Sequence, residues 1–67
     1  MRKLTFMHKT SGSGNGSCPA LYATDDGGYV VQGKFLDPGD VAQLRDLGDD
    51  ETAVWIPADV IDRLRAG

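Results

Sequence analysis

The segment from Pro19 to Phe35 constrains the fold most, because its turn chemistry and its hydrophobic pattern both indicate a β-hairpin. Asp26-Gly27 suits a two-residue type I′ turn, which requires positive φ at both central positions. This turn would place Tyr22 opposite Val31. An isolated two-stranded hairpin is marginal in water, so we expect a third strand, a helix or a partner chain to cover it.

Successive side chains of a strand point to opposite faces of the sheet. With the expected register, the inner face carries three aromatic residues and a valine, namely Tyr22, Tyr29, Phe35 and Val31. The other face is partly polar and carries Leu21, Ala23, Val30, Gln32 and Lys34. We expect no cover for this second face within the chain. The candidate interface residues are therefore Leu21, Ala23, Val30 and Trp55. Trp is enriched at binding hot spots, and a core position is the alternative for Trp55.

Two further segments are typical of strands. The alternation of Leu4 and Phe6 with polar neighbours predicts a strand near the start of the chain, and TAVWI is rich in residues that favour strands. Pro57 ends the second segment. The expected strands are Lys3–His8, Pro19–Asp25, Gly28–Phe35 and Thr52–Ile56.

Two short helices are also predicted. Asp37 suits an N-cap and Pro38 the first helical position, which indicates a helix running to about Leu47, with Gly48 just past its end. The expected second helix is Ala58–Arg65, in which an Asp59–Arg63 pair has favourable i, i+4 spacing.

These elements predict an α+β fold: a three- to four-stranded, mainly antiparallel sheet with two short helices packed on one face. Residues 1–67 should form a single small domain, with a flexible Gly/Ser-rich loop at 10–17. The expected core consists of Leu4, Phe6, Tyr22, Tyr29, Val31, Phe35, Val41, Leu44, Val54, Ile56, Ile61 and Leu64.

The small size of the chain predicts association. A domain of 67 residues buries only about 60% of the surface of its unfolded chain, and such scaffolds usually add disulfides, a metal or oligomerisation. The single Cys18 cannot form an internal disulfide. We therefore expect a protein-interaction or regulatory module that forms a homo-oligomer or binds a protein partner.

Catalysis is a weaker alternative. Cys18 with His8 as its base is the one available nucleophilic dyad, and the sequence shows no cation or helix terminus that would activate the thiol. The same two residues are too few for a tetrahedral zinc site. The Gly/Ser-rich loop lacks the Lys-Ser/Thr pair of a phosphate-binding loop. We expect no enzyme, cofactor or metal.

The charge and the hydropathy of the chain limit the classes of partner that we expect. The net charge of −3 argues against a nucleic-acid backbone as a ligand, although the basic residues Arg2, Lys3 and Lys9 leave weak nucleic-acid binding as a second alternative. No apolar run approaches the length of a membrane-spanning helix, and none resembles a signal peptide. We expect a cytoplasmic protein.

The order of motifs resembles a known family. SGSGNGSCP, DDGGYVVQG and ETAVWIPADVIDRL follow one another as in small actinobacterial proteins of unknown function, similar to the BldB and WhiJ-associated accessory proteins encoded beside helix-turn-helix regulators. The resemblance covers Ser11 to Leu64, and Cys18 matches the Cys that follows the family's Gly/Asn-rich loop. The Trp-x-Lys-Ser-Ser opening of the commoner group is absent. The resemblance implies an accessory protein that contacts a helix-turn-helix regulator, and it supplies no catalytic residues.

Overall fold

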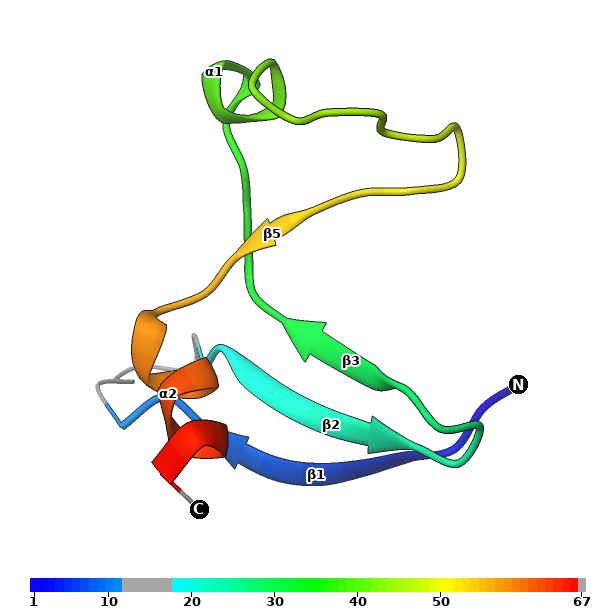
Figure 1. Ribbon diagram of the computed structural model, residues 1–67, viewed down its shortest axis with the longest axis vertical. Helices are drawn as coiled ribbons and strands as arrows, with labels where there is room; N and C mark the ends of the chain where they lie inside the picture. Colours follow the sequence, from blue (N-terminus) through cyan, green and yellow to red (C-terminus); the bar gives the residue numbers. More distant parts are fainter. Residues whose placement is uncertain (12–17, 67) are drawn as a thin grey trace.

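The computed structural model describes residues 1–11 and 18–66. Seven elements follow one another along the chain (Figure 1). They are β1 (Leu4–Lys9), β2 (Ala20–Thr24), β3 (Tyr29–Gln32), β4 (Lys34–Phe35), α1 (Pro38–Val41), β5 (Val54–Trp55) and α2 (Ala58–Ala66).

The strands form two separate antiparallel sheets. One has three strands in the order β1-β2-β3, and the other pairs β4 with β5. The α+β fold is therefore confirmed. The expected long strand Gly28–Phe35 is interrupted at Gly33, and its second part leaves the first sheet to pair with β5.

The hairpin between β2 and β3 has a three-residue loop instead of the expected two-residue turn. Thr24 donates its backbone N–H to Gly28 at 3.0 Å, and Gly27 has a φ of 92°. A left-handed glycine at the end of the loop is typical of three-residue hairpins. The side chain of Thr24 supports this loop by accepting the Gly28 N–H at 2.8 Å. As a result, Tyr22 lies opposite Val30, one residue away from the expected partner.

This one-residue shift reverses the two faces of β3, because side chains alternate along a strand. Tyr29 and Val31 share a face with Ala23 and Leu21, whereas Val30 lies with Tyr22 on the other side. The predicted grouping of these residues was therefore wrong.

A β-bulge lies in β1 between Phe6 and His8. Phe6 is opposite Tyr22, but His8 is opposite Leu21, so one residue of β1 is extra. Phe6 and Tyr22 pack edge to face, with ring centroids 5.7 Å apart. Beyond the bulge, His8 joins the Leu21 face, on which α2 packs.

The buried apolar side chains among the described residues are Ala20, Leu21 and Val60. Leu21 comes from the central strand and Val60 from α2, so the core lies at the junction of these two elements. The predicted core was largely wrong. Nine of its residues are exposed, namely Leu4, Phe6, Tyr29, Val31, Phe35, Val41, Leu44, Ile61 and Leu64.

We call residues 34–56 the arm. It leaves the first sheet at Gly33, where β5 crosses closely. A Cβ atom at this position would meet the backbone carbonyl of Trp55 and would lie 2.8 Å from Ile56 Cγ2 and 3.0 Å from Val54 Cγ2. Only glycine fits this crossing without displacing β5.

The helix within the arm is shorter than expected. Asp37 caps α1 as predicted, accepting the Asp40 N–H at 2.9 Å, and Pro38 occupies the first turn. The helix nevertheless ends at Val41 instead of near Leu47. Short helices depend on packing of an apolar face, and the expected stripe of Val41, Leu44 and Leu47 is exposed.

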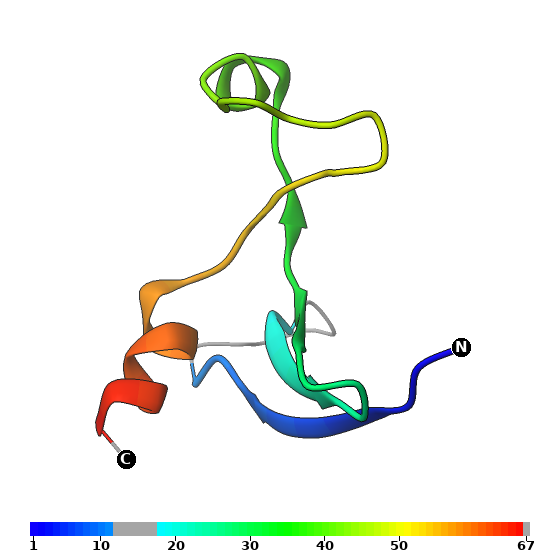
Figure 2. The same cartoon turned by 45° about the vertical axis from the view of Figure 1, so that its right-hand side comes forward.

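The arm extends away from the three-stranded sheet, so the molecule has an open shape (Figures 1 and 2). Helix α2 lies beside the sheet, whereas α1 lies at the far end of the arm. The prediction that both helices pack on the sheet therefore holds for α2 alone. The radius of gyration is 13.2 Å, compared with about 11 Å for a compact domain of this length.

Candidate interaction surface

Polar contacts fasten α2 to the end of β1. His8 Nε2 donates to the Val60 carbonyl oxygen at 2.7 Å, which fixes a proton on Nε2 because the carbonyl can only accept. Asp59 accepts the hydroxyl of Thr10 at 2.7 Å and the backbone N–H of Ser11 at 2.9 Å. Arg63 donates to the Lys9 carbonyl oxygen at 3.2 Å. In place of the expected Asp59–Arg63 pair, the two side chains bind the end of β1 and the two residues that follow it.

The same contacts set the ionisation of Asp59. The Ser11 backbone N–H, followed by the Thr10 hydroxyl, holds the pKa of the Asp59 carboxyl below its usual value of 3.8. Partial desolvation opposes this effect, and the charge of Arg63 adds to it. Thr10 and Ser11 are thus held in place, while residues 12–17 of the predicted flexible loop lie outside the described residues.

Of the two candidates for a nucleophilic dyad, His8 has another partner. Its Nε2 binds the Val60 carbonyl oxygen, as described. Cys18 is a half-buried free thiol. The dyad stays a prediction, without support from this contact.

The four predicted interface residues do not form one surface. Leu21 is only 2% exposed, because the His8–Val60 contact draws α2 over its face, so the expectation that this face lacks intrachain cover was wrong. Ala23 is half-buried on the same face, and Val30 is half-buried on the opposite one. Trp55 is 51% exposed on the arm, and its role as an interface residue stays a prediction.

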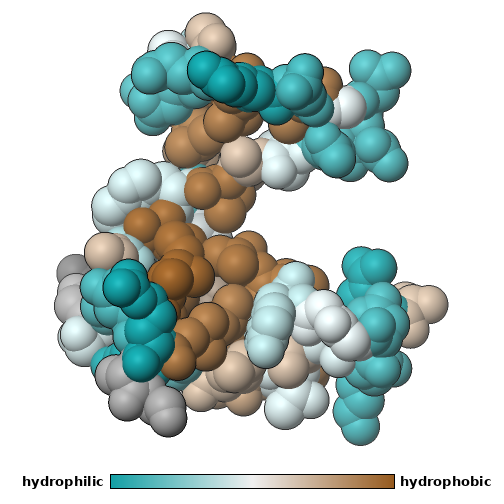
Figure 3. Space-filling view, viewed as in Figure 1, coloured by the Kyte–Doolittle hydropathy of each residue, from teal (hydrophilic) through white to brown (hydrophobic). Residues whose placement is uncertain are grey.

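Large apolar side chains are exposed on the sheet, the arm and α2. Those that were predicted to lie in the core include Leu4, Phe6, Tyr29, Phe35, Leu44, Ile61 and Leu64, and Leu47 and Trp55 are exposed as well. Figure 3 shows a hollow between the arm and the sheet whose wall is mostly hydrophobic. The helical spacing of Val41, Leu44 and Leu47 was the available signal for this surface, although Val41 and Leu44 were predicted to lie in the core.

The exposed area is unusually large for the mass. The chain exposes 5385 Å², whereas a folded monomer of 7.2 kDa is expected to expose about 4,100 Å². The difference of roughly 1,300 Å² exceeds the 800 Å² or so that each partner contributes to a standard interface. Surface of this extent and hydrophobicity is typical of a chain that binds another protein.

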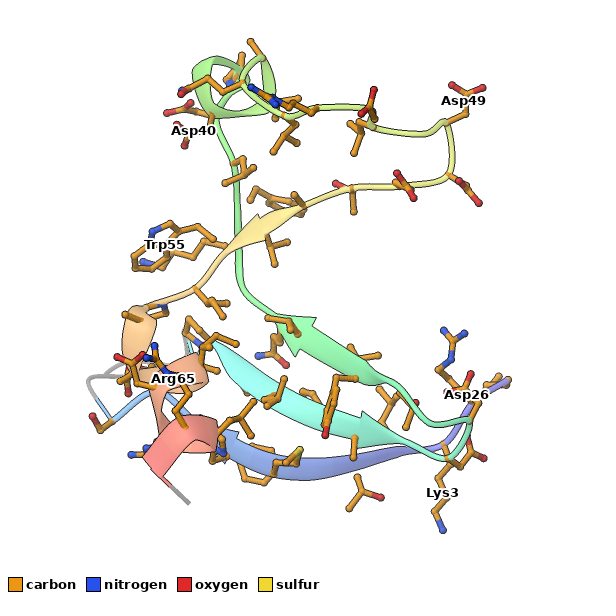
Figure 4. All side chains as sticks on the ribbon, viewed as in Figure 1. Lys3, Asp26, Asp40, Asp49, Trp55 and Arg65 are labelled. Carbon is orange, nitrogen blue, oxygen red and sulfur yellow. The ribbon has the colours of Figure 1, made fainter. Side chains whose placement is uncertain are left out.

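Charge is divided between the arm and the rest of the chain. The arm carries six carboxylates against Lys34 and Arg45, a net charge of −4, and the remaining residues carry five cations against four carboxylates, a net +1. In Figure 4 the acidic Asp49 and the basic Lys3 both lie on the open side of the molecule, one on the arm and the other on the sheet.

The basic end of the sheet is tied to the hairpin loop. Arg2 forms an ion pair with Asp26 at 2.9 Å, and Lys3 donates its backbone N–H to Asp25 at 3.0 Å. The hydroxyl of Thr24 also donates to Asp26. The Thr24 hydroxyl, followed by Arg2, lowers the pKa of the Asp26 carboxyl. The side chain of Lys3 is exposed and extends from this end of the sheet.

In the described part of the chain, no three His, Cys, Asp or Glu side chains gather into a possible metal site. Neither described helix has the length and apolar character needed to cross a membrane. Comparison of the chain with protein-family models, with curated proteins and with solved structures finds no match.

Proposed function

We propose that the protein is a small interaction module, accessory to a regulatory protein, that acts by associating with a protein partner through its exposed apolar surface. The observation that carries this proposal is the excess of roughly 1,300 Å² over the surface of a compact monomer. Large apolar side chains contribute to the exposed surface, among them Phe35 at 97% and Trp55 at 51% exposure. A partner chain would remove this surface from water, which is the main driving force of association.

The partner is either a second copy or a regulator. The resemblance to accessory proteins encoded beside helix-turn-helix regulators favours a regulator of that class as the heterologous partner. The acidic arm is compatible with such a partner, because DNA-binding regulators carry basic surfaces. Association with a second copy requires no other component.

Measurement of the native mass by light scattering, combined with a pull-down using the tagged chain, tests this proposal. We expect a dimer or a stable complex, and Trp55→Ala should weaken it about tenfold or more, since buried aromatic anchors carry much of the binding energy. Arg65→Ala is the matched control, because Arg65 is exposed and contacts only Asp62, at 3.8 Å, among the described ion pairs. A strict monomer that retains no partner would contradict the proposal.

A further inference from the structure

We propose that the occupant of the hollow is a second copy of the chain, and that the two copies exchange arms around a twofold axis. This inference rests on the proposed function and specifies its partner. Each arm would lie against the three-stranded sheet of the other copy. The apolar side chains on the two sides of the hollow would then be covered in both copies at once.

The shape of the chain supports this arrangement. The molecule is hollowed on one side, between the arm and the sheet (Figure 3). Rotation by 180° about the line of sight of Figure 1 turns a second copy so that its opening faces the first and its arm lies level with the sheet of the first. Such an interface is isologous, so each arm–sheet contact occurs twice and the assembly closes as a dimer.

The exposed area fits a dimer of this kind. If each copy buries its excess of roughly 1,300 Å², the interface totals about 2,600 Å², which lies in the range of obligate homodimers. Small domains commonly gain through oligomerisation the stability that their cores lack. The apolar core of the described residues consists of Ala20, Leu21 and Val60. Because this core is small, dimerisation would add substantially to the stability of the chain.

Charge complementarity favours a second copy over an unrelated chain. The tip of the arm carries the exposed acids Asp49 and Asp50, and the open end of the sheet carries the exposed base Lys3; Arg2, at the same end, is paired with Asp26 at 2.9 Å within the chain. The twofold rotation brings each acidic tip to Lys3 of the other copy. One chain therefore holds both halves of the electrostatic match. Glu51 is occupied within the arm, where it accepts the Gly48 N–H at 2.8 Å.

Charge reversal on the two sides of this contact tests the exchange. The arm variant is Asp49→Lys with Asp50→Lys, and the sheet variant is Lys3→Glu, which leaves the Arg2–Asp26 ion pair intact. Each variant alone places like charges together in both contacts, so we expect the dimer dissociation constant to rise at least about tenfold. An equimolar mixture restores opposite charges at both contacts and should give a heterodimer of near wild-type affinity, with one copy of each variant in the native mass spectrum.

A charge-matched control separates this effect from net charge. Asp40→Lys with Asp62→Lys changes the net charge by the same amount as the arm variant, but Asp40 lies on the side of the arm away from the opening (Figure 4). We expect this variant to dimerise as the wild type does. Recovery on mixing also guards against misfolding, since unfolded chains do not form a specific heterodimer.

The outcomes are distinct. A wild-type monomer that binds a regulator would overturn arm exchange and leave the proposed function standing. A dimer that is insensitive to both variants, or a mixture that associates no better than its components, would overturn arm exchange as well. A strict monomer without any partner would overturn both proposals.

Discussion

The α2–β1 junction and the arm contrast within one short chain. At the junction, Leu21 and Val60 are buried and the polar atoms of His8 and Asp59 have hydrogen-bond partners. In the arm, Phe35 and Trp55 are exposed, and the secondary structure is limited to two short strands and one turn of helix. Both regions contain amphipathic sequence, but only the junction has a second element to pack against.

This contrast shows that the hydrophobic pattern of a segment does not determine its burial. Val41, Leu44 and Leu47 have helical spacing, as do Val60, Ile61 and Leu64, yet only Val60 is fully buried. Helix α2 is held by contacts with residues about 50 positions earlier in the chain. The arm has local hydrogen bonds, such as the Asp37 cap, and these do not bury apolar surface.

The largest expected effect comes from matched truncations in the two regions. Leu21→Ala should lower the free energy of unfolding by about 2–4 kcal/mol, because it leaves a cavity in a small core. Leu47→Ala, at a position 45% exposed, should cost about 0.5 kcal/mol or less in the monomer. Urea unfolding measures both at the lowest practical protein concentration, since association raises apparent stability. Equal costs would show that the two regions do not differ in burial.

A smaller loss of stability is expected from a substitution at Gly33, where the arm leaves the sheet. Gly33→Ala would bring a Cβ atom against the backbone of Trp55, so the β4–β5 pairing should be lost at a cost of about 1–3 kcal/mol. Cross-strand NMR contacts of Lys34 with Trp55 report on this pairing, and those of β2 with β3 should remain.

Gly39→Ala is the matched control for this substitution. Its Cβ would have the Asp37 Oδ1 atom as nearest neighbour at 3.5 Å, an ordinary contact distance. The substitution should leave the β4–β5 contacts intact and stabilise the chain slightly, by about 0.5 kcal/mol. If Gly33→Ala behaved in the same way, the close crossing of β5 at Gly33 would be disproved.

The smallest expected effect is the loss of stability at low pH. The folded state lowers the pKa of Asp59, so its contribution to stability is complete above the usual value of 3.8 and is lost as the pH falls through the lowered folded value. Unfolding free energies measured between pH 6 and pH 2, roughly the range over which a carboxylate titrates, should therefore decline at the acid end.

Asp59→Asn should flatten part of this decline, and the remainder belongs in part to Asp26, whose pKa is also lowered. Asp62→Asn, at an exposed position of the same helix, should leave the slope closer to that of the wild type. An unchanged slope in Asp59→Asn would mean that the carboxylate does not hold α2 to the strand.

Elements whose signals are local were predictable from the sequence. The Asp37 cap and Pro38 at the first helical turn appear as predicted, and α2 begins at the expected Ala58. Strands β1 and β2 lie within one residue of their expected bounds. In each case the determining residues are neighbours in the chain.

Features that depend on distant contacts were not predictable. The sequence DDGG is compatible with a two- or a three-residue loop, and a difference of one residue moved Tyr29 and Val31 to the other face. For the candidate surface, Trp55 is exposed, and its predicted role as an anchor stays a prediction. Burial of Leu21 depends on α2 reaching back to β1 through His8, and nothing near Leu21 in the sequence indicates that contact.

The bulge in β1 determines which face of the sheet each later side chain of this strand points to. Without the extra residue, strict alternation would place His8 on the same face as Phe6, away from Val60. The bulge shifts the later residues by one position. The ring of Phe6 therefore lies on one side of the strand, and the imidazole of His8, two residues later, lies on the other. The number of residues between Phe6 and His8 is thus as much a part of the fold as their identity, because a change of one would exchange the two sides of the strand.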